Sequence, residues 1–166
     1  MQARKGFTLV EILIVVVILG ILAAIVIPQF TQASTEAKTN SLCSDLQSLR
    51  SQIELYKCQH NDTAPTAADF IAKMTQTTKL DGTASGSKER DVANDFEYGP
   101  YLERVPINPF NDKKDAGDAT QGSITSVAAK VSPGTDAASW QYNETTGEIW
   151  AGNSGATADG TNYADF

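Results

Sequence analysis

The chain has 166 residues, of which 41% are hydrophobic and 20% are charged, and its formal net charge is -7. Once a long apolar segment near the N-terminus is set aside, this length supports one small domain rather than two. Nucleic acids are bound mainly through Lys and Arg contacts to phosphate, so a chain this acidic is a poor candidate for binding them through its own surface.

The apolar segment runs from Phe7 to Ile27, and only Thr8, Glu11 and Gly20 interrupt it. At about 1.5 Å per helical residue it reaches about 30 Å, the thickness of the hydrocarbon core of a bilayer. A carboxylate inside such a span costs on the order of 3 kcal/mol on insertion scales, so an intramembrane acid usually has a partner and a function. The segment itself offers no cation, which makes Glu11 the first candidate functional residue.

Basic residues predict the orientation of the span. Arg4 and Lys5 precede it, and the next basic residue is Lys38. The positive-inside rule therefore places the N-terminus in the cytoplasm and most of the chain outside it.

A cleaved secretory signal fits the apolar segment less well, because the apolar core of such a signal has only about 7–15 residues and ends in an A-x-A site. A plain signal anchor explains the length and the charges but leaves Glu11 unexplained.

The N-terminal residues combine a short basic leader, Gly6, the aromatic Phe7, Glu11 four positions later, and the apolar run. Residues 1–30 resemble the N-terminus of type IV prepilins and type II secretion pseudopilins. The resemblance implies that a prepilin peptidase cleaves after Gly6 and methylates the new N-terminal residue, Phe7. Cleavage then creates an ammonium group on Phe7 of a neighbouring subunit, and a charge-assisted pair with it would offset the cost of burying Glu11 during filament assembly.

Gly20 and Pro28 bracket the end of the span. Pro28 removes one helical hydrogen bond, and Gly20 lies two turns earlier. The segment between them is therefore a candidate for stretching or local melting when subunits pack in a filament. The alternative is that both residues only bend the helix, because glycine and proline are common in transmembrane helices.

Beyond Pro28, apolar residues recur mostly at three- and four-residue steps, which predicts an amphipathic continuation of the same helix to about Lys57. We expect this stripe to pack on a sheet, because its heptads are too imperfect for a coiled coil. The stripe comprises Phe30, Ala33, Ala37, Leu42, Leu46, Leu49, Ile53 and Tyr56.

Cys43 and Cys58 both lie on this predicted helix. Their separation along it is about 22 Å, several times the reach of a disulfide, so we expect no bridge within one chain. Cys43 follows Leu42 and is expected to be a small core residue, whereas Cys58 is expected to be more exposed.

The remaining segments predict an α+β domain. Thr66 and Asp69 have capping-box spacing for a short helix to about Met74, and a polar loop is expected over residues 81–95. Residues 123–131 are rich in β-branched side chains, and residues 139–143 and 148–151 flank a turn that suits a hairpin. The expected fold is a long N-terminal helix, transmembrane and then amphipathic, packed on a small antiparallel β-sheet domain.

Two internal stretches, residues 56–66 and Gly99–Phe110, are similar to segments of the major pseudopilin of type II secretion systems. The chain departs from that pattern at Ala64, where an aromatic residue is usual, and at Phe110-Asn111, where Trp-Gly is usual. The resemblance implies the pilin fold and a structural, non-enzymatic role. The resemblance also implies that the chain is divided into three parts. These are a leader over residues 1–6, a transmembrane and filament-core helix over 7–28, and an amphipathic helix plus exported domain over 29–166.

The same resemblance implies the partners and location of the chain. The partners are further copies of the chain, prepilin peptidase, an inner-membrane assembly platform, minor pilins or pseudopilins, and membrane lipid before assembly. The location is a single pass through a bacterial inner membrane and then a periplasmic or surface filament. The alternatives are a type IV pilus subunit, for adhesion, motility or DNA uptake, and a signal-anchored binding or enzymatic domain.

Catalytic motifs of the common hydrolases, metalloproteases and nucleotide-binding proteins do not occur in the sequence. His60 is the one histidine, and it is expected to be a solvated turn residue. Asp112, Asp115 and Asp118 are calcium candidates, because the resembled pseudopilins hold calcium in their C-terminal sheet region. These aspartates lack the ordered spacing of known calcium loops, so solvated acids remain the alternative, and no other cofactor is expected.

Overall fold

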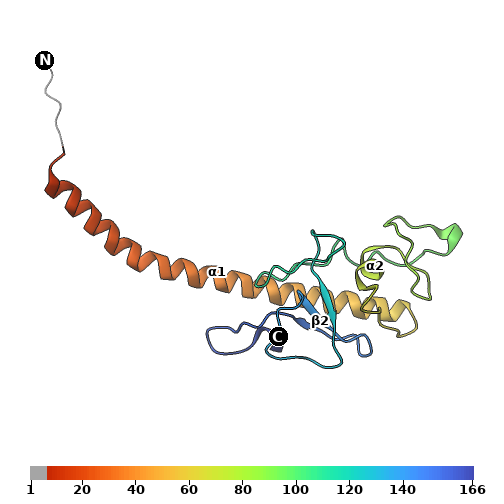
Figure 1. The fold of residues 1–166 in the computed structure, drawn as a ribbon. Helices are drawn as coiled ribbons and strands as arrows, with labels where there is room; N and C mark the ends of the chain where they lie inside the picture. The colour runs from red at the N-terminus through yellow and green to blue at the C-terminus, as the bar shows by residue number, and fades with distance from the viewer. Residues whose placement is uncertain (1–6) are drawn as a thin grey trace, which may run out of the picture. The chain divides into compact units, whose positions relative to one another are not determined.

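The computed structural model describes residues 7–166 (Figure 1). In chain order its elements are α1 (Leu9–Gln59), α2 (Phe70–Thr75), the 3-10 helix η1 (Val92–Asn94), β1 (Ile124–Ser126), β2 (Trp140–Tyr142), β3 (Ile149–Ala151) and the 3-10 helix η2 (Tyr163–Asp165). The chain divides into two compact units, Met1–Lys38 and Thr39–Phe166, which are described separately.

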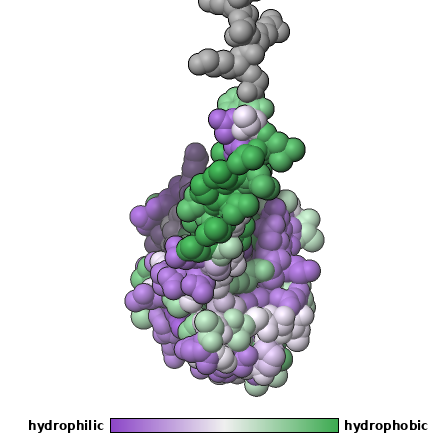
Figure 2. Space-filling model, turned by 90° about the vertical axis from the view of Figure 1, so that its left-hand side faces the viewer, coloured by the Kyte–Doolittle hydropathy of each residue, from purple (hydrophilic) through white to green (hydrophobic). Residues whose placement is uncertain are grey.

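In the first unit, α1 exposes apolar side chains on every side. The helix is long and apolar enough to cross a membrane, and Figure 2 shows this surface in green. It remains helical through Pro28, and the Thr31 hydroxyl donates to the Ile27 carbonyl at 3.2 Å. In the single chain the span is therefore a continuous helix.

In the second unit, the amphipathic part of α1 supplies one wall of the hydrophobic core. The buried members of its stripe are Leu42, Leu46, Leu49, Ile53 and Tyr56, each at most 2% exposed. The stripe prediction is confirmed for these residues. It is wrong for Phe30, Ala33 and Ala37, which are exposed because they precede the unit that begins at Thr39.

Cys43 and Cys58 are both free and exposed. The expectation of a core position for Cys43 is wrong, because one residue turns a helix by about 100° and the preceding Leu42 already occupies the buried face.

The three strands form a mixed sheet in the order β1-β2-β3. The predicted hairpin is confirmed: β2 and β3 are antiparallel, and the Asn143 N–H donates to the Glu148 carbonyl at 2.9 Å across the turn. The expected all-antiparallel sheet is wrong for β1, which pairs with β2 in parallel. Residues 127–139 return the chain to the starting end of β1, so β2 runs in the same direction. The α+β class itself is confirmed.

α2 packs Phe70 and Met74 into the core, and the Phe70 ring meets Tyr142 edge-on at 4.7 Å. Its predicted start is wrong. The helix begins at Phe70 after Asp69, whose side chain makes no capping hydrogen bond. The Thr66 hydroxyl instead donates to the Asp69 carboxylate at 3.2 Å, so these two residues pair with each other in the turn.

His60 is only 3% exposed, so the expectation of a solvated turn residue is wrong. Its ring stacks on Tyr56 with centroids 3.9 Å apart, Nδ1 lies 2.8 Å from the Tyr56 carbonyl, and Nε2 lies 3.0 Å from Thr78 Oγ1. The imidazole thereby joins the end of α1 to the segment around Thr78. Both ring nitrogens are satisfied, which is what burial of a histidine requires.

Asn108 joins three separate segments of the second unit. Its side-chain amide donates to the Ser139 carbonyl at 3.1 Å and to Asn153 Oδ1 at 2.8 Å, and its Oδ1 accepts from the Phe110 N–H at 2.9 Å. Asn108 is completely buried. Its removal would take the donor from Asn153 Oδ1 in the core and one of two hydrogen bonds from the Ser139 carbonyl, which also accepts from the Gly152 N–H at 2.9 Å.

We predict that Asn108→Ala lowers the free energy of unfolding by about 2–4 kcal/mol, because each buried group left unsatisfied costs about 1–3 kcal/mol. Urea unfolding of the full chain in detergent, followed by tryptophan fluorescence, measures the change. The control is Asn94→Ala, which removes an exposed amide bonded to Asp91 and should cost less than about 0.5 kcal/mol. Equal costs for the two variants would contradict the role assigned to Asn108.

A second prediction concerns alkaline pH. Burial raises the pKa of Tyr56 to about 12 and the pKa of Tyr101 to about 12, from an ordinary value of 10.0. Between pH 10 and 12 the tyrosines of the unfolded chain release protons that the folded chain retains. The contribution of Tyr56 and Tyr101 to stability is therefore constant below pH about 10 and falls as pH rises toward 12. The double variant Tyr56→Phe, Tyr101→Phe should show a shallower fall in urea midpoint than the wild type. Parallel curves would contradict the prediction.

Candidate functional site

Thr8 and Glu11 form a reciprocal pair at the start of α1. The Thr8 N–H and hydroxyl donate to Glu11 Oε2 at 2.8 and 2.9 Å. In return, the Glu11 N–H donates to Thr8 Oγ1 at 3.2 Å. This is a capping box, in which the N-cap residue and the third helical residue satisfy each other's backbone N–H groups.

The capping box explains why the helix begins at Leu9, directly after Thr8. The first N–H groups of a helix lack partners within it, and in lipid no water replaces them. The Glu11 carboxylate also lies at the positive end of the helix dipole. From the sequence, a cation was the only expected partner of Glu11. The missed signal was the Thr-x-x-Glu spacing before an apolar run.

Hydrogen bonds from Thr8 do not neutralise the charge of Glu11. The next basic residue after it in the chain is Lys38, about 40 Å further along the helix axis. The Glu11 carboxylate therefore accepts hydrogen bonds from Thr8 but remains an acid in an apolar segment. No basic residue between Glu11 and Lys38 compensates its negative charge.

The other predicted residues of this region are placed as follows. Gly6 lies outside the described residues. Phe7 is 84% exposed directly before the capping box. Gly20 and Pro28 lie inside α1, and a Cβ added at Gly20 would meet nothing within 4 Å. In this chain, then, no neighbouring group requires glycine at position 20.

Asp112, Asp115 and Asp118 are engaged in local contacts. Asp115 accepts hydrogen bonds from the N–H groups of Gly117 at 2.8 Å and Asp118 at 3.1 Å, and Asp112 lies 3.8 Å from Lys114. Hydrogen bonds from Thr120 hold the pKa of Asp118 below its usual range. Within residues 7–166, no three acidic, histidine or cysteine side chains come together as a metal site. These aspartates do not fit the calcium expected from the resemblance.

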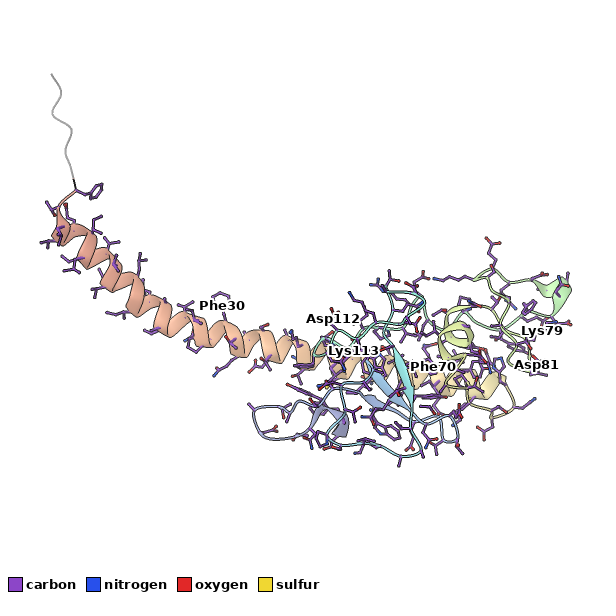
Figure 3. The ribbon with its side chains drawn as sticks, in the orientation of Figure 1. Phe30, Phe70, Lys79, Asp81, Asp112 and Lys113 are labelled. Atoms are coloured by element: carbon purple, nitrogen blue, oxygen red, sulfur yellow. The ribbon has the colours of Figure 1, made fainter. Side chains whose placement is uncertain are left out.

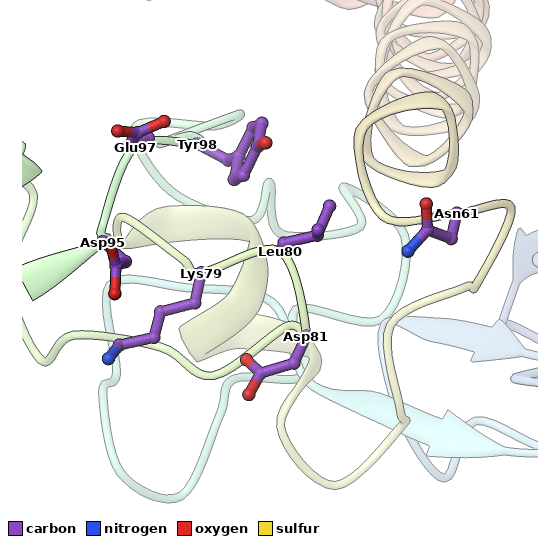
Figure 4. Close-up of a pocket in the computed structure, with 7 residues that line it drawn as sticks. All are labelled: Asn61, Lys79, Leu80, Asp81, Asp95, Glu97 and Tyr98. Atoms are coloured by element: carbon purple, nitrogen blue, oxygen red, sulfur yellow. The ribbon is translucent and has the colours of Figure 1, made fainter.

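An open groove of about 510 Å³ lies between the turn after α1 and the segment 79–98 (Figure 4). Figure 3 labels Lys79 and Asp81, which lie on this segment. The lining side chains combine one lysine with three carboxylates, and no serine, threonine or cysteine nucleophile is among them. They are Asn61, Lys79, Leu80, Asp81, Asp95, Glu97 and Tyr98.

Comparison with known proteins places the chain among filament subunits. Residues 1–27 match a family described as "Prokaryotic N-terminal methylation motif". The type II secretion system core protein G of Klebsiella pneumoniae is 32% identical over 110 residues, which are 66% of this chain and 71% of that protein. A fimbrial protein of Pseudomonas aeruginosa is 31% identical over 134 residues, 78% of this chain and 82% of that protein. No solved structure gives a significant match.

The long apolar helix packed through its second half on a small sheet is the architecture expected for a pilin, and it fits a membrane-anchored subunit. The similarity to core protein G and to fimbrial proteins extends well beyond the N-terminal motif. The chain therefore belongs to the type IV pilin-like family of pilins and type II secretion pseudopilins, and it is a structural subunit of that kind.

Proposed function

We propose that this chain is the major pseudopilin of a type II secretion system and polymerises into a helical filament through its N-terminal helices. The observation that carries this proposal is the 110-residue match to core protein G, which is four times longer than the 27-residue motif and must include much of the second unit. The fully buried Val105 and Asn108 belong to the stretch that resembles this pseudopilin, so that stretch is part of the core.

Processing precedes assembly in this proposal. Prepilin peptidase cleaves between Gly6 and Phe7 at the cytoplasmic face and methylates Phe7, and the inner-membrane platform then extracts the subunit. All atoms of the capping box lie on the C-terminal side of the cleaved bond, so the pair of Thr8 and Glu11 survives processing. The helix start is therefore fixed before and after cleavage.

Assembly uses the charge of Glu11, which has no basic residue between it and Lys38 to compensate it. Both hydrogen bonds from Thr8 reach Oε2 of Glu11, and within residues 7–166 no donor to Oε1 is seen. The Phe7 ammonium of a neighbouring subunit is a cation that processing creates, and a pair with it registers one helix against the next. Minor pseudopilins with the same N-terminus would join the filament by the same contact.

A type IV pilus subunit is the second candidate, favoured by the fimbrial relatives that this chain covers to 82% of their length. Deletion of the gene in its host distinguishes the two. A pseudopilin deletion abolishes release of secreted proteins and leaves surface pili intact. A pilin deletion removes the pili and leaves secretion intact, which would overturn the proposal.

Gly6→Val should leave full-length precursor in the membrane, because the peptidase needs a small residue before the cleaved bond. N-terminal sequencing of the membrane fraction measures this, and the wild type should begin at Phe7. Gly20→Val is the matched control: it adds the same bulk in open space within the span and should be cleaved normally. Normal cleavage of Gly6→Val would contradict the assigned site.

Glu11→Leu should insert into the membrane at least as well as the wild type, because it removes an insertion cost on the order of 3 kcal/mol. When co-expressed with the wild type, however, it should be under-represented in sheared filaments, because it cannot form the ion pair with Phe7. Thr8→Val should reduce incorporation less, since it removes the cap but keeps the charge. Thr31→Val is the control, because its hydroxyl only bonds the carbonyl of Ile27. Equal incorporation of Glu11→Leu and wild type would rule out an assembly role for Glu11.

A further inference from the structure

The two cysteines occupy different exposed positions on one helix. Cys58 follows the buried Tyr56 by two residues, or about 200° of helical turn, and therefore lies on the face opposite the core. Cys43 follows Leu42 by one residue and lies at the side of the buried face. Both thiols are thus accessible to another molecule.

An intrachain bridge between them is excluded by distance. Both residues lie within the unbroken α1, about 22 Å apart along its axis, whereas the Cα atoms of a disulfide lie about 4.4–6.8 Å apart. If the second unit lies outside the cytoplasm, as the proposed function requires, its thiols meet an environment in which disulfides form and persist. A partner thiol must then come from another molecule.

We propose that Cys43 of one subunit forms a disulfide with Cys58 of another subunit in the filament. This inference rests on the proposed function. A helical filament repeats one head-to-tail contact between two different patches of the same chain. Two different cysteines can therefore link every subunit to two others, whereas one cysteine per chain could only join subunits in pairs.

The surroundings of Cys43 provide space and charge for the end of a second helix. A groove of about 370 Å³ lies beside it, lined by Cys43, Leu46, Gln47, Arg50, Ser51 and Phe166. Arg50 is held there by hydrogen bonds to the carbonyls of Ile149 at 3.1 Å and Phe166 at 2.6 Å. Cys58 is the penultimate residue of α1, where the helix dipole is negative, so the Arg50 cation complements the helix end that carries Cys58.

The chemistry is thiol–disulfide exchange with a disulfide carrier of the compartment, R–S–S–R. The Cys43 thiolate attacks one carrier sulfur, which forms a mixed disulfide and releases one RS⁻. The Cys58 thiolate of the second subunit then attacks the Cys43 sulfur and releases the other RS⁻. The two electrons reduce the carrier disulfide to two thiols, and the two thiol protons pass to solvent or to the released thiolates.

The test uses filaments sheared from cells, treated with N-ethylmaleimide to block free thiols, and run on gels without reductant. The wild type should give a ladder of dimers and higher multimers that collapses to monomer on reduction. Cys43→Ser and Cys58→Ser should each abolish the whole ladder, because every bridge needs one thiol of each kind. Ser48→Ala, an exposed change on the same helix, should leave the ladder unchanged.

Co-expression of tagged and untagged chains should give a mixed dimer whose Cys43–Cys58 peptide is found by mass spectrometry. Intact filaments with only monomeric, alkylated subunits would overturn this inference alone. Dimers that persist in either single variant would also overturn it, because they would show like-with-like pairing. An absence of filaments in the wild type would overturn the proposed function and this inference with it.

Discussion

The contact between the apolar stripe of α1 and the sheet is the interaction on which the second unit depends. Five side chains from Leu42 to Tyr56 are almost completely buried, and Trp140, Tyr142 and Ile149 of the sheet are buried in the same core. The three strands have only three residues each, at the short end of the usual range, and so small a sheet gains its stability by packing against the helix. The two parts of the helix therefore have different roles. The first part is apolar on all sides, as a membrane span requires, and the second part is apolar on the face that packs against the domain.

Patterns local in the sequence were sufficient to predict the main elements. Periodicity predicted the helix and its buried face from Leu42 onward, and the turn at residues 144–147 predicted the hairpin of β2 and β3. Features that depend on distant partners were not predictable. His60 is buried because Thr78, eighteen residues away, completes its hydrogen bonds, and β1 is parallel because of the path of an irregular segment. The capping box could have been predicted, since Thr8 and Glu11 are three residues apart. It was missed because only the charge of Glu11 was considered.

The capping box changes how Glu11 is understood. In the single chain the carboxylate is not an isolated acid in an apolar helix, because it accepts two hydrogen bonds and fixes the helix start. Those bonds reduce the cost of burying it, yet they supply no positive charge, and buried charges are stable only when paired. Local structure thus prepares the site, and in the proposed filament a second subunit completes it. This division explains how one residue serves both the inserted precursor and the proposed filament.

The most direct test of this account is the distance between Glu11 and Phe7 of different subunits in the assembled filament. Solid-state NMR can measure this distance. The filaments are assembled from a mixture of two kinds of subunit, one labelled with ¹³C at the Glu11 carboxylate and the other with ¹⁵N at Phe7. Only contacts between subunits then bring the two labels together. An ion pair between the two subunits predicts a carbon–nitrogen coupling that corresponds to about 3–4 Å. A filament that is intact but shows no such coupling would contradict it.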